Sequence, residues 1–522
     1  MKWKTLEHNG VVFPPEYKPK GFKIKIKEKT IELNIQQEEM AVAWAKKKDT
    51  PYVQDQVFVE NFVKDFLRLF SPEFRDATIN DISFSEIYEW MNKESEVVID
   101  KETKKKLTVE RKRIREELKG KYGIANVDGQ TFDISNWMVE PPGIFMGRGK
   151  HPLRGKWKPR INREDVTLNL GEDVKVSPGD WGQIVHDHDS MWLARWIDKL
   201  VGKEKYVWLS DAATLRQERD KDKYDKASKL SQQIEKVINK TYKAMKSNNI
   251  KECKIATVCY LIYKLAMRVG DEKDPDETDT VGATTLRVEH MKLTDRIIEF
   301  DFLGKDSVRW QKSIEFDGRN NVIYENMRKF IKGKKDDELI FSGITSRHVN
   351  NFFNNIVLGL SAKVFRTHLA TEIVRHYLSS VDSKITKSSE FVKIYHVRVA
   401  NLEAAITCNH KKAPTKNFEQ ILDKKREKIK NMEEAKPNTN KQKEKLKERK
   451  EKAELQLKLA ESTKDYNLGT SLRNYIDPRV VKAWADHVDL EWKKIYTSAL
   501  QRKFLWVEKE TPRWQKIVIK SH

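Results

Sequence analysis

Residues 417–461 constrain the fold of this chain more than any other segment, because they thread a thin apolar seam through a dense run of charges. The seam recurs at heptad-like spacing on both sides of the turn-forming residues 435–440, at Phe418, Leu422, Ile429 and Met432 and then at Leu446, Ala453, Leu457 and Ala460. This pattern predicts a coiled-coil hairpin of two antiparallel helices, each about 30 Å long. A disordered charged linker is the weaker alternative, because the seam appears twice.

The hairpin separates blocks of different character. Short strands and helices mix before residue 205, and a mainly helical pattern follows, interrupted by one β-hairpin in which residues 298–302 pair with residues 308–310. We therefore predict a multidomain α+β protein. Its expected parts are an N-terminal cap and binding core (1–205), a catalytic core (206–411), the coiled-coil linker (412–462) and a small helical C-terminal domain (463–522).

The charge of the chain indicates a polyanionic partner. Lys and Arg number 101 against 79 Asp and Glu, a formal charge of +22, and such an excess favours binding that weakens as salt rises. We see no apolar run long enough to cross a bilayer, and the first residues lack a signal-peptide core. Only three cysteines occur and none forms a CxxC pair, which predicts a reducing, intracellular environment.

Tyr475 is the side chain with the strongest local context. Asp477 followed by Pro478 has the pattern of a helix start, with an acceptor at the N-cap and proline in the first turn. The phenol therefore lies just before a helix N-terminus, where backbone donors and the helix dipole favour a phosphate. By these residues alone, Tyr475 is either an ordinary hydrogen-bond donor or a nucleophile.

Signals for a cofactor are weak. The Gly-Lys pairs at 149–150 and 304–305 lack the glycine that a nucleotide phosphate loop requires five positions earlier. The run His186-Asp187-His188-Asp189 could suggest a metal site, but it lies among turn residues with no third ligand group, so we expect a solvated hairpin turn. We expect neither a cofactor nor a metal.

Isolated cations stand in settings that ordinary surface charge does not require. They are Arg268 at the end of an apolar helix (255–269), Lys305 at the β-hairpin tip, Lys363 and Arg366 three apart on one helical face, and His410 at a helix end. Each has an ordinary explanation, since cations satisfy helix C-termini and hairpin tips are solvated.

A second cluster is denser. No acid occurs between Glu140 and Glu164, and seven cations accompany Trp157 there: Arg148, Lys150, Arg154, Lys156, Lys158, Arg160 and Arg163. A solvated face normally interleaves acids, so we predict a strip that contacts phosphates.

Taken in order, these pieces resemble the eukaryotic-type DNA topoisomerase IB family across essentially the whole chain. The resemblance is carried by residues 3–10 (WKTLEHNG), 140–145 (EPPGIF), 265–270 (LAMRVG), 287–290 (RVEH), 299–307 (EFDFLGKDS), 362–367 (AKVFRT), 408–410 (CNH) and 468–479 (LGTSLRNYIDPR). The linker is shorter than in the animal enzymes, and Met146 stands where a basic residue is familiar.

The resemblance implies a two-lobed clamp around duplex DNA and a set of site residues. Its catalytic positions fall on Arg268, Lys305, Arg366, His410 and the nucleophile Tyr475. The positions implied to bind DNA are Arg148, Lys150, His151, Asp306, Lys363 and Asn474.

The reaction implied is cleavage of one strand through a 3′-phosphotyrosyl bond, rotation and religation, by a monomer that needs neither ATP nor metal. Friction from the linker on the rotating strand is a further hypothesis. The implied location is with chromosomal DNA, in an archaeal cytoplasm or nucleoid, or in a nucleus if the source is eukaryotic.

Two alternatives stay open. A tyrosine recombinase uses almost the same residues but shows His-x-x-Arg where this chain has Lys363-x-x-Arg366. A non-enzymatic architectural protein would explain the charge but not the ordered site residues.

Overall fold

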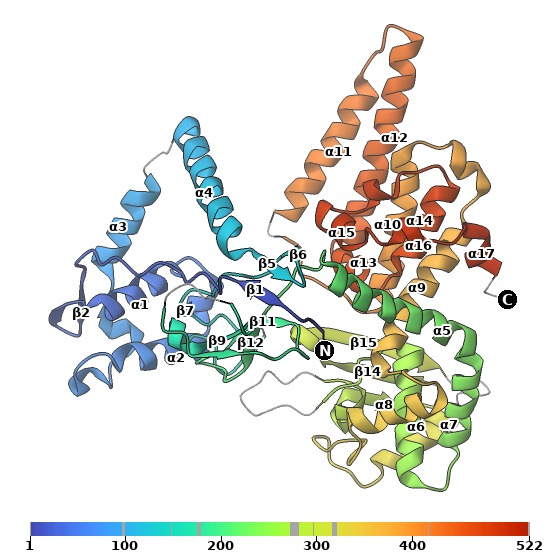
Figure 1. Cartoon of the computed structure of the whole chain (residues 1–522), viewed down its shortest axis with the longest axis horizontal. Helices are drawn as coiled ribbons and strands as arrows, with labels where there is room; N and C mark the ends of the chain where they lie inside the picture. The colour runs from blue at the N-terminus through green and yellow to red at the C-terminus, as the bar shows by residue number, and fades with distance from the viewer. Residues whose placement is uncertain are drawn as a thin grey trace. The chain divides into compact units, whose positions relative to one another are not determined.

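The computed structural model describes residues 2–96, 100–147, 149–174, 179–271, 281–295, 297–315, 321–415 and 417–519 (Figure 1). The chain forms two compact units, and the break between them falls at Arg216 and Gln217. Helices and several small sheets occur together, so the predicted mixed α and β class is confirmed. Among the described helices none is both long and apolar enough to pass through a membrane.

The first unit builds small sheets and helices around two apolar cores. Its helices are α1 (Ile35–Ala45), α2 (Gln56–Leu67), α3 (Ser85–Glu96) and α4 (Lys101–Tyr122). One sheet has the strand order β1 (Leu6–His8), β5 (Ile124–Val127), β6 (Gln130–Asp133). A second has the order β3 (Lys29–Glu32), β2 (Lys23–Ile26), β4 (Ile82–Ser83), and β7 (Gly143–Ile144) pairs with β8 (Trp157–Lys158) in a third. The largest sheet has the order β10 (Gln183–Val185), β9 (Val166–Asn169), β11 (Trp192–Ile197), β12 (Glu204–Trp208).

The predicted hairpin turn at residues 186–189 is wrong. β10 runs parallel to β9 while β11 pairs antiparallel with the other edge of β9, so residues 186–189 cross over a strand rather than join two neighbours. The rings of His186 and His188 bind the backbone carbonyls of Leu170 and Trp3, and His188 also stacks on the Trp3 ring. These contacts, distant in sequence, give both histidines a structural role.

The second unit is mainly helical and contains one described three-stranded sheet, β13 (Met291–Leu293), β14 (Ile297–Gly304) and β15 (Val308–Glu315). Its longer helices are α5 (Thr214–Met245, which begins at the unit boundary), α6 (Ile250–Leu265), α7 (Asn321–Ile331), α8 (Ser346–Ile356), α9 (Ala362–Ser380), α10 (Glu390–Thr407), α11 (Phe418–Glu434) and α12 (Asn440–Thr463). The C-terminal segment adds α13 (Leu468–Asn474), α14 (Pro478–His487), α15 (Ser498–Lys503), α16 (Val507–Glu510) and α17 (Trp514–Ile519).

Two cores hold this unit together. The first surrounds α6, which is buried on nearly all sides and packs against α7, α8 and α9. The second joins α9 and α10 to the C-terminal segment, and its members include Trp484, Phe504 and Tyr475. The predicted C-terminal domain therefore shares its core with helices of the predicted catalytic core, and the four-part division stays a prediction.

The predicted β-hairpin is present as β14 and β15. Ile298, Phe300 and Phe302 point inward with at most 5% exposure while the residues between them are exposed, which is the alternation of a sheet with one buried face. The strands stay paired up to Gly304 and Val308, so residues 305–307 form the tip. The pairing thus fixes the backbone position of Lys305.

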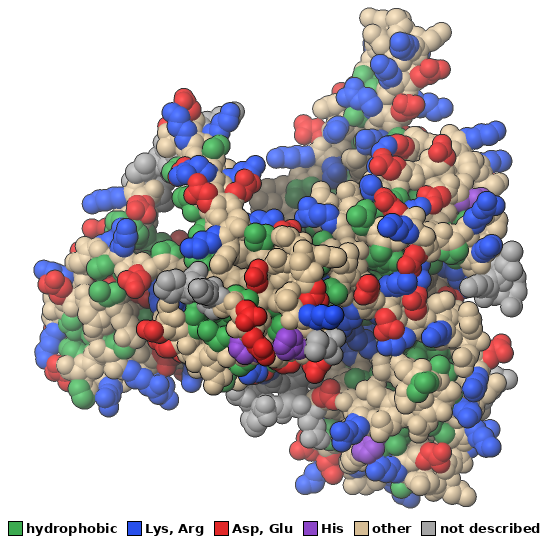
Figure 2. Space-filling model, viewed as in Figure 1, with side chains coloured by type: hydrophobic (Ala, Val, Ile, Leu, Met, Phe, Trp, Pro, Cys, Tyr) green, Lys and Arg blue, Asp and Glu red, His purple; other side chains and the backbone are tan. Residues whose placement is uncertain are grey.

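The predicted antiparallel helix pair is present as α11 and α12, which lie side by side and extend away from α10, α13 and α14 (Figure 1). Leu422 and Ala453 of the seam are buried. Ion pairs join the helices between Arg426 and Glu461 and between Lys450 and Glu433, both at 2.9 Å. Figure 2 shows cationic and acidic side chains interspersed over this pair.

Candidate active site

Tyr475 lies in the tight connection between α13 and α14. Its backbone N–H closes α13 by donating to Ser471, and Asp477 begins α14 by accepting the N–H of Arg479, with Pro478 in the first turn. The predicted helix start is therefore confirmed. The side chain is 9% exposed and belongs to the second core of the unit.

The backbone around Tyr475 is held from α9. The Thr371 hydroxyl donates to the Tyr475 carbonyl at 3.2 Å and accepts the Asp477 N–H at 3.0 Å. On the other side, the Ser471 hydroxyl donates to the side chain of Asn401 on α10 at 2.6 Å. These bonds lie within the unit core and fix the direction in which the phenol leaves the chain.

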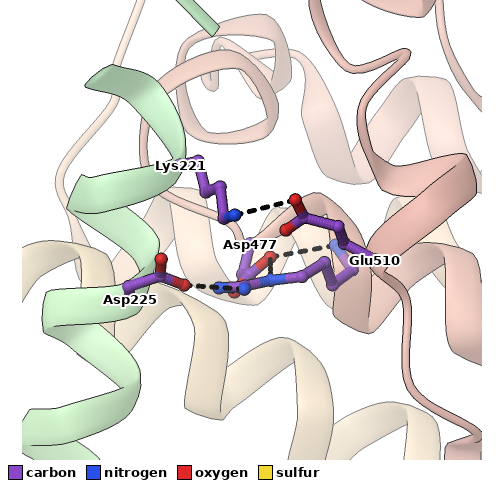
Figure 3. A network of polar contacts seen from close by, with 5 residues as sticks. Lys221, Asp225, Asp477 and Glu510 are labelled. Carbon is purple, nitrogen blue, oxygen red and sulfur yellow. Dashed lines mark hydrogen bonds and ion pairs between the residues drawn. The ribbon is translucent and has the colours of Figure 1, made fainter. Parts of the chain in front are cut away.

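Ion pairs then tie the start of α14 to α5 (Figure 3). Arg479 donates to both carboxylate oxygens of Asp477, and also to Asp225 at 2.7 Å. Lys221, one turn earlier on α5, pairs with Glu510 at 2.7 Å. Because Arg479 and Asp477 are largely buried, this network constrains the helix start more than a surface pair would.

Arg366 lies at the centre of the site. It is on α9, 4% exposed, and its two terminal nitrogens donate to the carbonyls of Ala266 (2.7 Å) and Cys408 (2.8 Å). Its guanidinium also lies 5.1 Å from the centre of the Tyr475 ring. The carbonyls bind both terminal nitrogens of the buried cation and leave its charge beside the phenol.

Arg268 is not part of a helix, contrary to the prediction of a helix over 255–269. α6 ends at Leu265 because Ala266 adopts a left-handed conformation (φ 54°), and the freed carbonyls are taken by cations from other elements. Arg268 then follows in a segment without regular secondary structure, where its own carbonyl accepts the N–H of Ala283 at 2.8 Å.

His410 follows α10 after Asn409, which is also left-handed (φ 55°). Its ring stacks on Tyr475 with centroids 5.2 Å apart, and its Nε2 lies 3.3 Å from an Arg366 nitrogen. Because arginine only donates, Nε2 is the acceptor and the ring proton is on Nδ1. Burial and then the charges of Arg366 and Arg268 lower the pKa of His410 to about 3, so the ring is neutral at neutral pH.

The electrostatics also act on Tyr475. Burial raises the pKa of the phenol, but the positive charges of Arg366 and Arg268 outweigh it, and the net shift is downward. A phenol with a lowered pKa forms its oxyanion more readily near neutral pH.

Lys305 and the two arginines line one cavity of about 40 Å³, together with Met267, Gly304 and Asn409. Lys305 is exposed at the tip of the β14–β15 hairpin. All five predicted catalytic residues thus fall in one region of the second unit: three line this cavity, and Arg366 connects it to His410 and Tyr475.

The predicted DNA-binding residues are divided between the two units. Lys363 is exposed whereas Arg366 is buried, so their side chains do not share one surface. Asn474 is exposed and donates to the Thr470 carbonyl. The side chain of Asp306 lies outside the described residues, as does all of Arg148.

The first unit carries the predicted phosphate-contacting strip, and its cations lie in different settings. Lys150 is exposed, and the His151 ring lies edge-on to Phe145. Three other cations of the strip are ion-paired: Arg154 with Asp55, Lys158 with Glu140 and Asp198, and Arg160 with Glu39. The acids come mostly from distant segments, so the strip is not a row of free cations.

Residues that hold the site were missed by the sequence reasoning. Thr371, Asn401, Arg479 and Asp225 act through contacts 70 or more residues apart. Of the residues in this network, only Asp477 could be recognised in the sequence, as the N-cap residue of α14.

Thr371→Val should lower the free energy of unfolding by about 1–3 kcal/mol, because it keeps the shape but leaves the buried Asp477 N–H without an acceptor. Urea unfolding followed by tryptophan fluorescence measures the loss. Thr371→Ser keeps the hydroxyl and should recover most of it; equal losses in both variants would show that the hydroxyl is not what matters.

His410 should make the protein less stable in acid. With a folded pKa near 3 and an unfolded value of 6.5, the unfolded chain binds the proton first, so stability falls as the pH drops from 6.5 towards 3. Glutamine does not titrate. Between pH 7 and pH 5, His410→Gln should therefore lose about 1–2 kcal/mol less than the wild type in thermal unfolding.

The control is His487→Gln, which removes an exposed histidine of α14 and should follow the wild type. An identical pH dependence for all three proteins would mean that His410 takes up its proton equally in the folded chain.

Comparison with known proteins covers nearly the whole chain. Residues 1–209 match the family "Eukaryotic DNA topoisomerase I, DNA binding fragment", residues 212–443 match "Eukaryotic DNA topoisomerase I, catalytic core", and residues 447–516 match "C-terminal topoisomerase domain". Among curated relatives, DNA topoisomerase 1 beta of Arabidopsis thaliana is 36% identical over 98% of this chain and 59% of its own length. DNA topoisomerase 1 of Drosophila melanogaster is 35% identical over 97% of this chain and 54% of its own length.

DNA topoisomerase 1 of Homo sapiens is 33% identical over 97% of this chain and 71% of its own length. The chain spans little more than half the length of the plant and fly proteins. The first matched segment falls in the first unit, and the other two cover almost exclusively the second unit. This chain belongs to the eukaryotic-type DNA topoisomerase I family.

Proposed function

We propose that this chain is a type IB DNA topoisomerase, which cuts one strand of duplex DNA, lets it rotate and reseals it, and so relaxes positive and negative supercoils. The observation that carries the proposal is the setting of Tyr475. Its phenol has a lowered pKa and lies against the Arg366 guanidinium and the His410 ring, in a chain of this family.

In the proposed reaction the Tyr475 oxygen attacks a backbone phosphorus. The tyrosyl O–P bond forms as the P–O5′ bond breaks, the phenolic proton passes to solvent, and Lys305 gives a proton to the leaving 5′ oxygen. The product is a 3′-phosphotyrosyl chain with a free 5′ hydroxyl. Because the new ester keeps the energy of the phosphodiester, the reverse attack reseals the strand without ATP.

Charge builds on the non-bridging oxygens in the transition state, and the proposal assigns it to Arg268, Arg366 and His410. Guanidinium groups offer planar pairs of donors that match phosphate geometry. Arg366 is held in place before any substrate arrives, because two carbonyls fix its terminal nitrogens. Preorganised donors stabilise the transition state without reorganisation at the moment of reaction.

His410 must gain a proton on Nε2 before it can donate a hydrogen bond to a phosphate oxygen. In the free protein its Nε2 accepts from Arg366, so this nitrogen carries no proton. A phosphate anion next to the ring raises the pKa of the imidazole, and protonation gives Nε2 a hydrogen to donate. We therefore assign the donor role of His410 to the DNA-bound state.

The proposal includes the partner and its contacts. Double-stranded DNA is the polyanion that fits the formal charge of +22. Arg148, Lys150, His151, Asp306, Lys363 and Asn474 are assigned to DNA contact. We further propose that one copy of the chain suffices and that it works inside the cell on chromosomal DNA.

The wild-type protein should relax negatively and positively supercoiled plasmid in EDTA without nucleotide, and Tyr475→Phe should lower the rate by a factor on the order of 10⁴ or more. Agarose-gel relaxation assays measure the rate. Denaturation during the reaction should trap the wild-type protein, and not the variant, on the 3′ end of a labelled strand.

Tyr466→Phe is the matched control, since it removes another phenol of the same segment and should leave relaxation unchanged. Undiminished relaxation by Tyr475→Phe would end the proposal. Activity that needs two DNA sites brought together would favour the recombinase alternative instead.

A further inference from the structure

Lys312 makes an unusual pair of contacts that the proposed reaction does not use. It lies on β15, and its ammonium donates to the carbonyl of Leu265, the last residue of α6, at 2.8 Å. The same nitrogen donates to the carbonyl of Thr407, the last residue of α10, at 2.6 Å. One cation thus bridges the C-terminal ends of two helices.

Arg366 makes the equivalent pair of contacts, one residue further along each of the two turns. It donates to the carbonyls of Ala266 and Cys408, which directly follow the two residues that Lys312 contacts. Two cations from different elements therefore join four carbonyls of the same two turns. The last carbonyls of a helix have no partner within it and lie at the negative end of its dipole, so both ends would repel each other without these donors.

These turns carry two of the proposed catalytic residues. Arg268 stands three residues after Leu265, and His410 stands three residues after Thr407. Each turn also contains a left-handed non-glycine residue, Ala266 or Asn409. Such conformations are unfavourable by themselves and persist only where surrounding contacts impose them.

We propose that Lys312 is a positioning residue, whose ammonium ties the ends of α6 and α10 together and thereby sets Arg268 and His410 against Tyr475. The proposal rests on the function proposed above. Lys312 is partly buried and points at carbonyl oxygens, so it acts through the two turns and not by touching DNA.

The surroundings of Lys312 make this bridge sensitive to pH. Besides the carbonyls, the charged and titratable groups acting on it are Cys408 and Arg366, and its nitrogen lies 5.6 Å from the centre of the Trp310 ring. Burial lowers the pKa of Lys312 to about 8; Cys408 opposes this shift and Arg366 adds to it. Above this pH the bridge loses its charge, whereas an arginine in its place would not.

The first experiment does not depend on activity. Cys408 is 2% exposed in the bridged turn, and its alkylation by iodoacetamide can be followed by peptide mass mapping. Lys312→Met should raise the rate at Cys408 about tenfold or more, because two charge-assisted bonds are lost. Lys312→Arg should stay close to the wild type. Cys253 and Cys259 are also buried and should change little, unless the whole unit is destabilised.

The second experiment measures the covalent step. Lys312→Met should slow single-turnover adduct formation on a duplex that cannot be resealed by about 10²-fold. Duplex affinity, measured for the same substitution with Tyr475→Phe, should stay within about twofold. Lys312→Arg should recover most of the rate. Lys292→Met is the control, since it removes an exposed cation from the same sheet and should leave the rate unchanged.

The pH dependence of the adduct rate separates the effect of the Lys312 charge from the other effects of the substitution. The ratio of the wild-type adduct rate to that of Lys312→Arg should fall as the pH rises through about 8. Unchanged Cys408 protection in Lys312→Met, or a loss of duplex affinity equal to the loss of rate, overturns the positioning role. If the wild type forms no adduct at all, the proposed function fails, while the Cys408 result still decides whether Lys312 holds the turns.

Discussion

A buried guanidinium organises the whole site. Arg366 is almost completely removed from water, and a charge in that position is strongly destabilising unless carbonyls or acids replace the lost hydration. The carbonyls of Ala266 and Cys408 replace it, and both are available only because α6 and α10 end where they do. The same interaction therefore joins the ends of two helices, offsets part of the cost of burying the cation and leaves a positive charge beside Tyr475 and His410.

The phenol is held by an independent set of contacts. Thr371 of α9 fixes the backbone on both sides of Ile476, and Arg479 anchors the following helix start to Asp225 on α5. Position and electrostatics thus come from different side chains, although Thr371 and Arg366 both lie on α9. The cations shift the pKa of Tyr475 downward, while the Thr371 hydroxyl and the Arg479 ion pairs fix the backbone that carries the phenol. Rigid placement of both groups is what a proposed reaction at one phosphorus atom requires.

Features written in local sequence could be predicted. The β14–β15 hairpin follows from alternation around a polar tip, the start of α14 from Asp477 and Pro478, and the α11–α12 pair from an apolar seam that recurs across a turn. The roles of the individual site residues came from family resemblance and stay predictions. Features that depend on a distant partner were predicted wrongly, as with the end of α6 at Leu265 and the connection at residues 186–189. The ion pairs of Arg154, Lys158 and Arg160 were not predicted at all, for the same reason.

The sequence alone determined the mixed class, the excess of positive charge and the family, because each is carried by composition, short-range periodicity or contiguous sequence motifs. Only the tertiary structure decided which cations are exposed and which already bind an acceptor within the protein. Arg160 and Lys312 look alike in sequence, yet one pairs with Glu39 and the other bridges two helix ends. The physical reason is that a cation binds whichever acceptor the folded chain places beside it. These acceptors lie about 50 to 120 residues away in the sequence.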